Sequence, residues 1–454
     1  MKQYETYKDS GIEWIGEIPE HWEIVPLKYR FAFSKGLSIT KEDLVSEGVP
    51  VISYGQVHSK VNPGTTTHDH LLRFVPSTTT NKFESAKVNV GDFIFADTSE
   101  DLEGCGNCAY IDRDGIYAGY HTIVFHSLYP SDNKYLAYLF LTDEWRSQIR
   151  SSVMGTKVYS ITQNILSKVS IILPPQEEQA RIAAWLDWKI GQVDAIVTEK
   201  EAMVADLQSY RQSLITEAVT YGLNSNCSLC NSHIDWIKMI PSNWRIIPLK
   251  YRFALSTGLA ITKADLINEG VPVISYGQVH SKLNSGTSIQ EHLLRYVPKS
   301  LTEGKSSAKV ALGDFIFADT SEDLEGCGNC AYIDRDGIYA GYHTVVFHSL
   351  YPGDNKYLAY LFLTDEWRSQ IRRSVMGTKV YSVTQNILSK VSIILPPPSE
   401  QKEIAEFLDH KTAEIDALLS DLREQITDLR SYKASLISEA VTGKIDLRDW
   451  EPQN

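Results

Sequence analysis

Three kinds of residue group in this sequence have types and spacings that could do chemistry. The first is a set of C-x-x-C pairs, at residues 105/108, 227/230 and 327/330. Such pairs bind zinc or exchange disulfides, but a zinc site needs four ligands, and each pair has only scattered histidines near it. We therefore interpret the 105/108 and 327/330 pairs as small buried residues of a turn, and we predict no metal site. The 227/230 pair, with His233, is a slightly better cluster, but it lies in an apparent linker.

The second group is acidic. The segment ADTSED supplies Asp97, Glu100 and Asp101, and the same letters return at 318–323. Hydrolytic chemistry would need further ligands that the sequence does not identify, so we interpret these carboxylates as solvated turn residues. The sequence also has no P-loop, no complete G-x-G-x-x-G and no Asn/Asp-Pro-Pro-aromatic motif for methyl transfer to a base amino group. We predict no catalytic residues and a protein that is not itself an enzyme.

The third group consists of polar loops whose side chains could contact bases and phosphates. The segments are SKGLSITK, SYGQVHSK and GTKVYS, together with their counterparts at 256–263, 275–282 and 377–382. Singly, each is an ordinary surface loop, but all three occur twice. The predicted DNA-contacting residues are Lys35, Thr40, Lys41, Gln56, His58, Ser59, Lys60, Thr156, Lys157, Tyr159, Thr262, Lys263, Gln278, His280, Ser281, Lys282, Thr378, Lys379 and Tyr381.

These groups belong to a duplication that covers most of the chain. At one constant offset and without gaps, the sequence matches itself from Trp14/Trp236 to Thr220/Thr442, and GDFIFADTSEDLEGCGNCAYIDRDGIYAGYHT is identical at 91–122 and 313–344. This offset is far longer than the period of a solenoid, whose units are about 20 to 50 residues long. It indicates a duplicated pair of domains.

Each half contains a globular part and a helical part. Short β-rich runs alternate with turn residues over 1–175, and one helix is expected over 132–153 within them. We predict an α+β fold with four segments: a globular domain over 1–175, a long helix over 176–222, a near-duplicate globular domain over 223–397, and a second long helix with a tail over 398–454. Residues 223–235 are expected to connect the two halves.

A heptad pattern in the two helical segments predicts a coiled coil. One seam position is held by Leu186, Val193, Lys200, Leu207 and Leu214 in the first helix and by Leu408, Ile415, Leu422, Leu429 and Leu436 in the second. The alternate seam position of the second helix is assigned to Ile404, Lys411, Leu418, Gln425 and Tyr432. We expect the two helices to pair antiparallel, with a globular domain at each end and a pseudo-two-fold axis, and polar seam residues to fix the register.

The net charge of −13 is unevenly spread. By segment it is −5 over 1–175, −4 over 176–222, +2 over 223–397 and −6 over 398–454. An acidic chain is a poor candidate for DNA binding on composition alone. The polar N-terminus has no apolar signal segment and no run reaches membrane-spanning length, so a cytoplasmic protein without a membrane partner is expected.

The sequence resembles the DNA-specificity subunits of type I restriction–modification enzymes. The resemblance rests on YKDSGIEWIGEIPEHWEIVPLKY, on the two junctions GTKVYSITQNILSKVSIILPPQEEQARIAAWLD and GTKVYSVTQNILSKVSIILPPPSEQKEIAEFLD, and on the ending SLISEAVTGKIDLRDW. It implies two target recognition domains, each reading half of a bipartite site in double-stranded DNA. It also implies helices that set the half-site separation and dock two methyltransferase subunits, and a motor-nuclease partner. The resemblance places S-adenosylmethionine, ATP and Mg in the partners, with no cofactor in this chain.

The near-identity of the two halves adds a hypothesis to the resemblance. Two copies of one recognition domain are expected to read identical, inverted half-sites. Because the helical segments carry most of the negative charge, the partners are expected to supply much of the charge that neutralises phosphates. Two alternatives stay open: a coiled-coil scaffold with paired protein-binding domains, and a thiol- or zinc-dependent enzyme.

Overall fold

The computed structural model describes residues 2–80, 83–129, 133–155, 157–351, 353, 355–377 and 379–451. These form two compact units, 1–201 with 424–454 and 202–423. Each unit combines a globular part with a stretch of both long helices, so the units do not coincide with the four predicted segments, whose limits stay a prediction.

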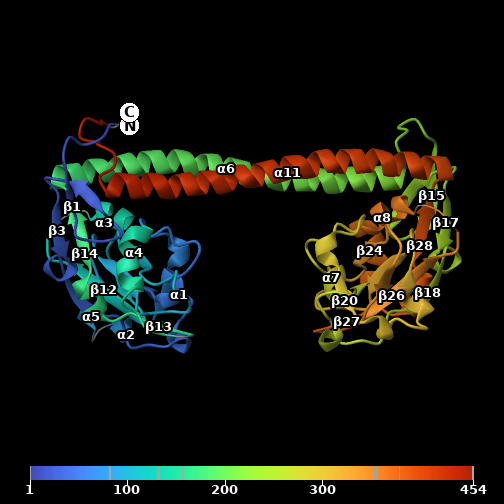
Figure 1. Ribbon diagram of the computed structural model, residues 1–454, viewed down its shortest axis with the longest axis horizontal. Helices are drawn as coiled ribbons and strands as arrows, with labels where there is room; N and C mark the ends of the chain where they lie inside the picture. The colour runs from blue at the N-terminus through green and yellow to red at the C-terminus, as the bar shows by residue number, and fades with distance from the viewer. Residues whose placement is uncertain are drawn as a thin grey trace. The chain divides into compact units, whose positions relative to one another are not determined.

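The first unit is built from two four-stranded sheets, three short two-stranded ladders and several helices (Figure 1). One sheet has the order β10(Cys108–Tyr110), β8(Phe93–Ala96), β12(Thr122–Ser127), β4(Phe31–Lys35), and all its pairs are antiparallel. The other has the order β6(Arg73–Val75), β5(Val49–Ile52), β11(Ile116–Ala118), β7(Lys87–Val88), and only β5 and β11 are parallel. The ladders are β1(Tyr7–Asp9) with β2(Glu17–Pro19), β3(Glu23–Pro26) with β14(Ser170–Leu173), and β9(Thr98–Ser99) with β13(Tyr159–Ser160). The helices are α1(Tyr54–Val57), α2(Ser77–Thr80), α3(Lys134–Leu139), α4(Asp143–Arg150), α5(Gln163–Lys168) and α6(Gln176–Tyr221).

The second unit repeats the same sheets in the same order. They are β24(Cys330–Tyr332), β22(Phe315–Ala318), β26(Thr344–Ser349), β18(Phe253–Thr257), and β20(Arg295–Val297), β19(Val271–Ile274), β25(Ile338–Ala340), β21(Lys309–Val310). The ladders are β15(Leu229–Ile234) with β16(Ile237–Pro241), β17(Arg245–Pro248) with β28(Ser392–Leu395), and β23(Thr320–Ser321) with β27(Tyr381–Ser382). The helices are α7(Tyr276–Val279), α8(Lys356–Phe362), α9(Asp365–Arg372), α10(Gln385–Lys390) and α11(Pro398–Val441). The α+β fold class with two repeated domains is thus confirmed, and part of the expected connector is strand β15.

The helix expected over 132–153 is two helices instead. The first ends at Leu139, and Thr142 caps the second, because its side-chain oxygen accepts from the backbone N–H of Trp145 at 3.3 Å. A threonine in an extended conformation before an acidic first turn favours a new helix start over continuation. The break lets α3 and α4 both pack on the aromatic core around Phe95, whose ring stacks on Phe125 at 4.2 Å.

Within each unit, a stretch of α6 lies beside a stretch of α11 in antiparallel register (Figure 1). In the first unit Asp194 pairs with Lys433 and Glu201 with Arg430, so residue numbers fall on one helix as they rise on the other. The predicted seam residues Lys200 and Gln425 are hydrogen-bonded to each other at 2.5 Å. None of the helices in the described ranges is both long and apolar enough to cross a bilayer.

The alternate seam of α11 is correct at Ile404, which is buried, but the prediction is one residue too early further along the helix. The buried partners of Leu408 and Ile415 are Thr412, Leu419 and Ile426, whereas Leu418 is 53% exposed. In each heptad the second seam position can lie three or four residues after the first. The heptad period is the same in both cases, so it does not tell which residue faces the partner helix. Burying Leu419 and Ile426 removes more apolar surface from water than burying Lys411 and Gln425, and this favours the later set.

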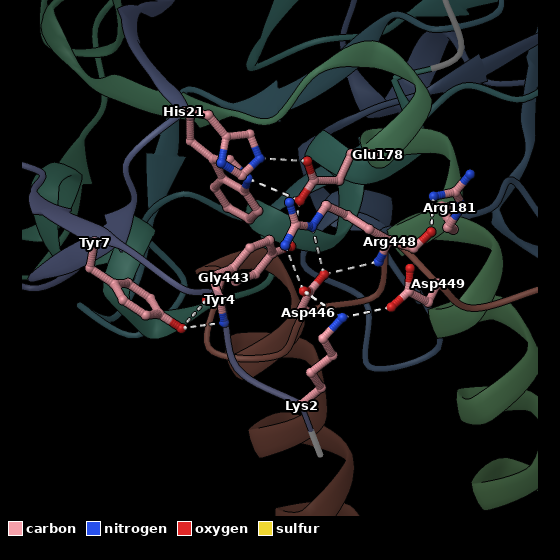
Figure 2. A network of polar contacts seen from close by, with 11 residues as sticks. Lys2, Tyr4, Tyr7, His21, Glu178, Arg181, Gly443, Asp446, Arg448 and Asp449 are labelled. Atoms are coloured by element: carbon pink, nitrogen blue, oxygen red, sulfur yellow. Dashed lines mark hydrogen bonds and ion pairs between the residues drawn. The ribbon is translucent and has the colours of Figure 1, made fainter.

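A buried carboxylate joins the start of α6 to the globular part of the first unit (Figure 2). Glu178 is 5% exposed and accepts from the Tyr4 hydroxyl, from Trp22 Nε1 at 3.1 Å and from the His21 ring at 2.9 Å. Burial and the hydrogen bond to Glu178 raise the pKa of Tyr4. In the second unit Glu400 accepts from Trp244 Nε1, also at 3.1 Å.

The same region of the first unit holds the C-terminal tail against the N-terminal segment (Figure 2). Asp446 accepts from the Arg448 guanidinium and lies 3.8 Å from Lys2 Nζ, and its backbone N–H donates to the Lys2 carbonyl. The hydrogen bonds from Arg448 lower the pKa of Asp446. The two ends of the chain thereby complete one unit together.

We predict that Glu178→Gln lowers the free energy of unfolding by about 1–3 kcal/mol, because the neutral amide turns an NH₂ donor toward donors in a buried site. Chemical denaturation measures the change. Glu177→Gln is the matched control, since Glu177 is exposed in the same helical turn. Equal effects of the two substitutions would contradict the role given to Glu178.

A histidine–carboxylate pair recurs in both units. His126 Nδ1 lies 3.0 Å from Asp92 Oδ2, and its Nε2 lies 2.9 Å from Ser34 Oγ; His348, Asp314 and Ser256 repeat the arrangement at the same distances. The hydrogen bond to the buried aspartate raises the pKa of each histidine.

A raised pKa in the folded state means that the protonated histidine stabilises the fold. This stabilisation is complete below the unfolded pKa, near about 6.5, and is lost as pH rises through the folded pKa. We predict that the double variant His126→Gln, His348→Gln melts further below wild type at about pH 5.5 than at about pH 8.5. The exposed His292→Gln is the control, and a pH-independent difference for the double variant would exclude this linkage.

Candidate functional site

Each unit contains a large open cavity, and every lining position of the first recurs in the second, which is also lined by Asp365 and Arg372. In the first unit its volume is about 730 Å³, and it lies between α1, β9 with the loop that follows, α4 and the loop after β11. In the second it is about 950 Å³. The lining residues of the first are Tyr54, Gly55, His58, Thr98, Ser99, Glu100, Asp101, Glu103, Gly104, Asn107, His121, Arg146 and Val158.

His58 connects two segments that line the cavity through hydrogen bonds of its ring. Its Nε2 lies 2.8 Å from the Thr98 carbonyl oxygen and its Nδ1 lies 3.1 Å from Asn107 Nδ2, so both ring nitrogens are engaged within the protein. Gly104 passes close to this ring: a Cβ there would lie 2.6 Å from Ser99 Oγ and 3.1 Å from His58 Nδ1. The loop over 98–104 can adopt this path because position 104 has no side chain.

His121 stands at the mouth of the cavity in a left-handed conformation, with φ of 53°. Residues other than glycine seldom adopt this region, and those that do cluster at functional sites. Its Nδ1 lies 3.3 Å from Asp97 Oδ1 and its ring packs edge-on to Tyr54 at 5.7 Å. Asp97 Oδ1 has no hydrogen-bond partner among the described residues, so a ligand can meet the His121 ring as donor or as acceptor. His343 repeats this geometry with φ of 55°.

Arg146 of α4 supplies the cationic part of the lining. Its Nε donates to the Phe140 carbonyl oxygen at 2.8 Å, and burial lowers its pKa. Among the described residues no carboxylate forms an ion pair with its guanidinium, so it is desolvated without a direct counter-charge. Arg368 donates in the same way to Phe362 at 2.7 Å, and burial lowers its pKa as well.

The loop over 98–104 contributes acceptors. Asp101 Oδ1 accepts from the Gly104 backbone N–H at 2.6 Å, which shapes the loop. Glu100 and Glu103 are exposed and line the cavity. The cavity therefore combines a half-buried donor with exposed acceptors, and an aromatic ring with a histidine beside them. Such a surface suits a ligand that carries both acceptors and donors.

The structure brings two of the three predicted recognition segments to this cavity. His58 and His280 line it, and Val158 places the segment of Lys157 and Tyr159 at its edge. Gln56 is occupied within the protein, because its Oε1 accepts from the Ser53 backbone N–H at 3.1 Å; Gln278 repeats this bond. The segment around Lys35, Thr40 and Lys41 does not line it.

The remaining predicted residues have simpler settings. Thr40 and Thr262 each hydrogen-bond the aspartate three residues later. Thr156 and Thr378 lie outside the described residues. All lysines among the predicted DNA-contacting residues are exposed, namely Lys35, Lys41, Lys60, Lys157, Lys263, Lys282 and Lys379. Contact of any of these residues with DNA stays a prediction.

Sequence reasoning missed four contributors to the cavity, namely Tyr54, Asn107, His121 and Arg146. The ADTSED segment was noticed but interpreted as a solvated turn. The sequence does contain one signal for the cavity. Residues 91–122, which include ADTSED and the YHT segment after β11, return without any difference at 313–344.

The predicted burial of four cysteines is confirmed, but only Cys105 and Cys327 lie in a turn, whereas Cys108 and Cys330 begin strands β10 and β24. Cys105, Cys108, Cys327 and Cys330 are buried and have free thiols. Burial raises the pKa of Cys108 and of Cys330 to about 12, so neither is a ready thiolate. Within the described ranges, no group of three or more His, Cys, Asp or Glu side chains is placed to hold a metal ion.

A family comparison gives this geometry its context. The sequence profile of the type I restriction modification DNA specificity domain matches residues 19–202 and again 241–428. The chain belongs to this family: it is a DNA-specificity subunit of the type I restriction–modification class.

Its similarity to individual relatives is low but extends over the whole chain. It is 23% identical to the specificity subunit of the type I restriction enzyme StySPI of Salmonella potsdam, over 97% of this chain and 92% of that one. The EcoKI specificity subunit of Escherichia coli K12 is 21% identical, with the same shares covered.

Two solved structures share the fold. A chain from a study of complex assembly and conformational transition of the type I R-M system has a TM-score of 0.68 at 18% identity, covering 94% of this chain and 99% of that one. The HsdS subunit from Thermoanaerobacter tengcongensis has a TM-score of 0.50 at 18% identity, covering 94% and 98%.

We predict that Gly104→Ala destabilises the first unit by about 1–3 kcal/mol, because the added methyl overpacks the loop against His58. Gly55→Ala is the matched control: this glycine lines the same cavity, but a Cβ there would meet nothing within 4 Å. Thermal unfolding of both variants measures the difference. A variant at position 104 as stable as the control would show that the loop is free to move away.

Proposed function

We propose that this chain reads a bipartite sequence in double-stranded DNA and carries the subunits that modify it. The observation that supports the proposal most directly is the duplication of one cavity, with matching lining residues, in two units of a DNA-specificity subunit. Two recognition sites on one chain fit two half-sites better than one continuous sequence. The globular parts, over 1–175 and 223–397, act as the two recognition domains.

The two half-sites are identical and inverted. The cavities share Tyr54/Tyr276, His58/His280, His121/His343 and Arg146/Arg368, so they present the same hydrogen-bonding groups. The two copies diverge most over 62–85 and 284–307, and none of the described residues in these ranges lines either cavity.

The long helices set the spacing between the half-sites and dock two methyltransferase subunits. Their surfaces carry the excess negative charge of the chain, which suits protein partners rather than phosphates. The partners bring S-adenosylmethionine for methylation of adenine at N6, and the motor-nuclease subunits bring ATP and Mg. This chain recognises the DNA sequence and supplies no catalytic group.

The test is a methylome. The chain is expressed with its cognate methyltransferase subunit, the two are shown to co-purify, and modified adenines are sequenced at single-base resolution. The expected result is one bipartite motif whose halves are inverted copies around a non-specific spacer.

Each other result has a definite meaning. Unrelated halves would contradict the identical-half-site proposal while keeping the recognition function. Failure of a methyltransferase subunit to bind, with no adenine mark, would favour the scaffold alternative. A bipartite motif that stays unchanged in both halves when residues 1–175 are replaced by an unrelated recognition domain would contradict the assignment of one half to each domain.

A further inference from the structure

We propose that the cavity of each unit reads a guanine–cytosine pair in its half-site, with Arg146 or Arg368 donating to the guanine and a carboxylate of the loop after β9 or β23 accepting from the cytosine. The proposal rests on the proposed function and deepens it. It names the base pair and the side chains that select it.

The proposal starts from Arg146, whose terminal nitrogens have no carboxylate partner among the described residues. Arg146 lines the cavity, yet its one hydrogen bond to the described part of the protein comes from Nε, at 2.8 Å from the Phe140 oxygen. Its terminal nitrogens have no carboxylate partner there. The side chain is half-buried at the cavity, so a ligand there can offer acceptors to a fork that no carboxylate of the described residues occupies.

The neighbouring thiol does not supply that partner. Burial raises the pKa of Cys108 to about 12, so the thiol is neutral and gives the guanidinium no counter-charge. The two terminal nitrogens of Arg146 form a planar fork that matches two adjacent acceptors. In the major groove, guanine presents such a pair in its O6 and N7 atoms, whereas adenine presents N7 beside an amino donor.

The second step is the acceptor set at the rim. The carboxylate of Glu100 has no donor among the described residues, and Asp101 uses only Oδ1, for the Gly104 N–H. His121 Nε2 adds a further acceptor when its ring is neutral. In a G·C pair the cytosine N4 amino group is the donor beside the guanine acceptors, and carboxylates are its usual partners.

The same placement in both units strengthens the argument. Arg368 lines the second cavity and bonds only the Phe362 oxygen, at 2.7 Å, within the described residues. Glu322 and Asp323 occupy the rim positions. Within the described residues, a half-buried guanidinium without a carboxylate partner therefore lines the cavity of each unit.

The experiment uses the assembled methyltransferase complex and one substitution in one unit. Arg146→Lys keeps the charge but loses the fork. We expect the methylome to show one G·C position relaxed in one half of the motif, with the other half unchanged. Arg368→Lys is the mirror variant and relaxes the opposite half. Glu100→Gln is the second variant, and it is expected to weaken selection of the same pair through the cytosine.

A binding measurement gives the size of the effect. A duplex with 7-deazaguanine at the selected position lacks the N7 acceptor, and wild-type complex is expected to bind it about 10- to 100-fold more weakly than unmodified DNA, as for loss of a bidentate base contact. The Arg146→Lys complex should show little further loss for the half read by its first unit. Arg73→Lys is the control, because Arg73 is exposed on β6 and bonds only backbone carbonyls among the described residues.

The outcomes separate the two proposals. A bipartite motif without G·C in its halves, or a folded Arg146→Lys complex whose motif matches wild type in both halves, overturns the cavity assignment and leaves the proposed function standing. Absence of any bipartite motif from the wild-type complex overturns the proposed function instead.

Discussion

A hydrogen bond from an indole to a glutamate fixes how each long helix leaves its globular part, and this glutamate is buried in the first unit and half-buried in the second. Glu178 and Glu400 stand in the first turn of α6 and α11, and each accepts from a tryptophan of the preceding domain at 3.1 Å. A charge removed from water has to be satisfied by hydrogen bonds, so the helix cannot rotate about its start without breaking them. The direction in which each helix departs from its domain is therefore set at this one residue.

The chain segments that lie beside this glutamate–tryptophan hydrogen bond differ between the two units. In the first, the N-terminal segment and the C-terminal tail come together by hydrogen bonds and ion pairs, with Lys2, Asp446 and Arg448 at the centre. In the second, the corresponding stretch of chain continues covalently from α6 through β15 and β16. At Glu400, Asn243 occupies the position of His21 and donates to the carboxylate at 3.3 Å, whereas the described residues contain no counterpart of the Tyr4 bond.

Most of the fold could be predicted from patterns along the sequence. The repeat, the strand-rich halves and the long heptad helices follow from spacing along the chain, and the structure has all three. The failures occurred where the deciding contact is distant in sequence. Leu419 rather than Leu418 faces inward because of what lies on the neighbouring helix, and Thr142 breaks a helix whose apolar pattern runs on, because both pieces pack on Phe95 and its neighbours.

The cavity was hidden for the same reason. Tyr54, Glu100, His121 and Arg146 come from four separate stretches of sequence, and none has a spacing that relates it to the others. His58 was singled out for its polarity, yet both of its nitrogens serve the framework. Only the fold distinguishes a histidine that holds a wall from one that faces the opening.

The closing strand of each globular part has a consequence for how the chain acquires its structure. β14 pairs with β3 and β28 with β17, each across nearly the whole sequence of its domain, and the segments containing β14 and β28 are identical over KVSIILPP. Either strand therefore fits either partner. Synthesis from the N-terminus removes this ambiguity, because the first domain can close before the second copy of its strand exists. A full-length chain refolding from denaturant has no such order, and exchanged strands then become a kinetic trap that the sequence itself does nothing to disfavour.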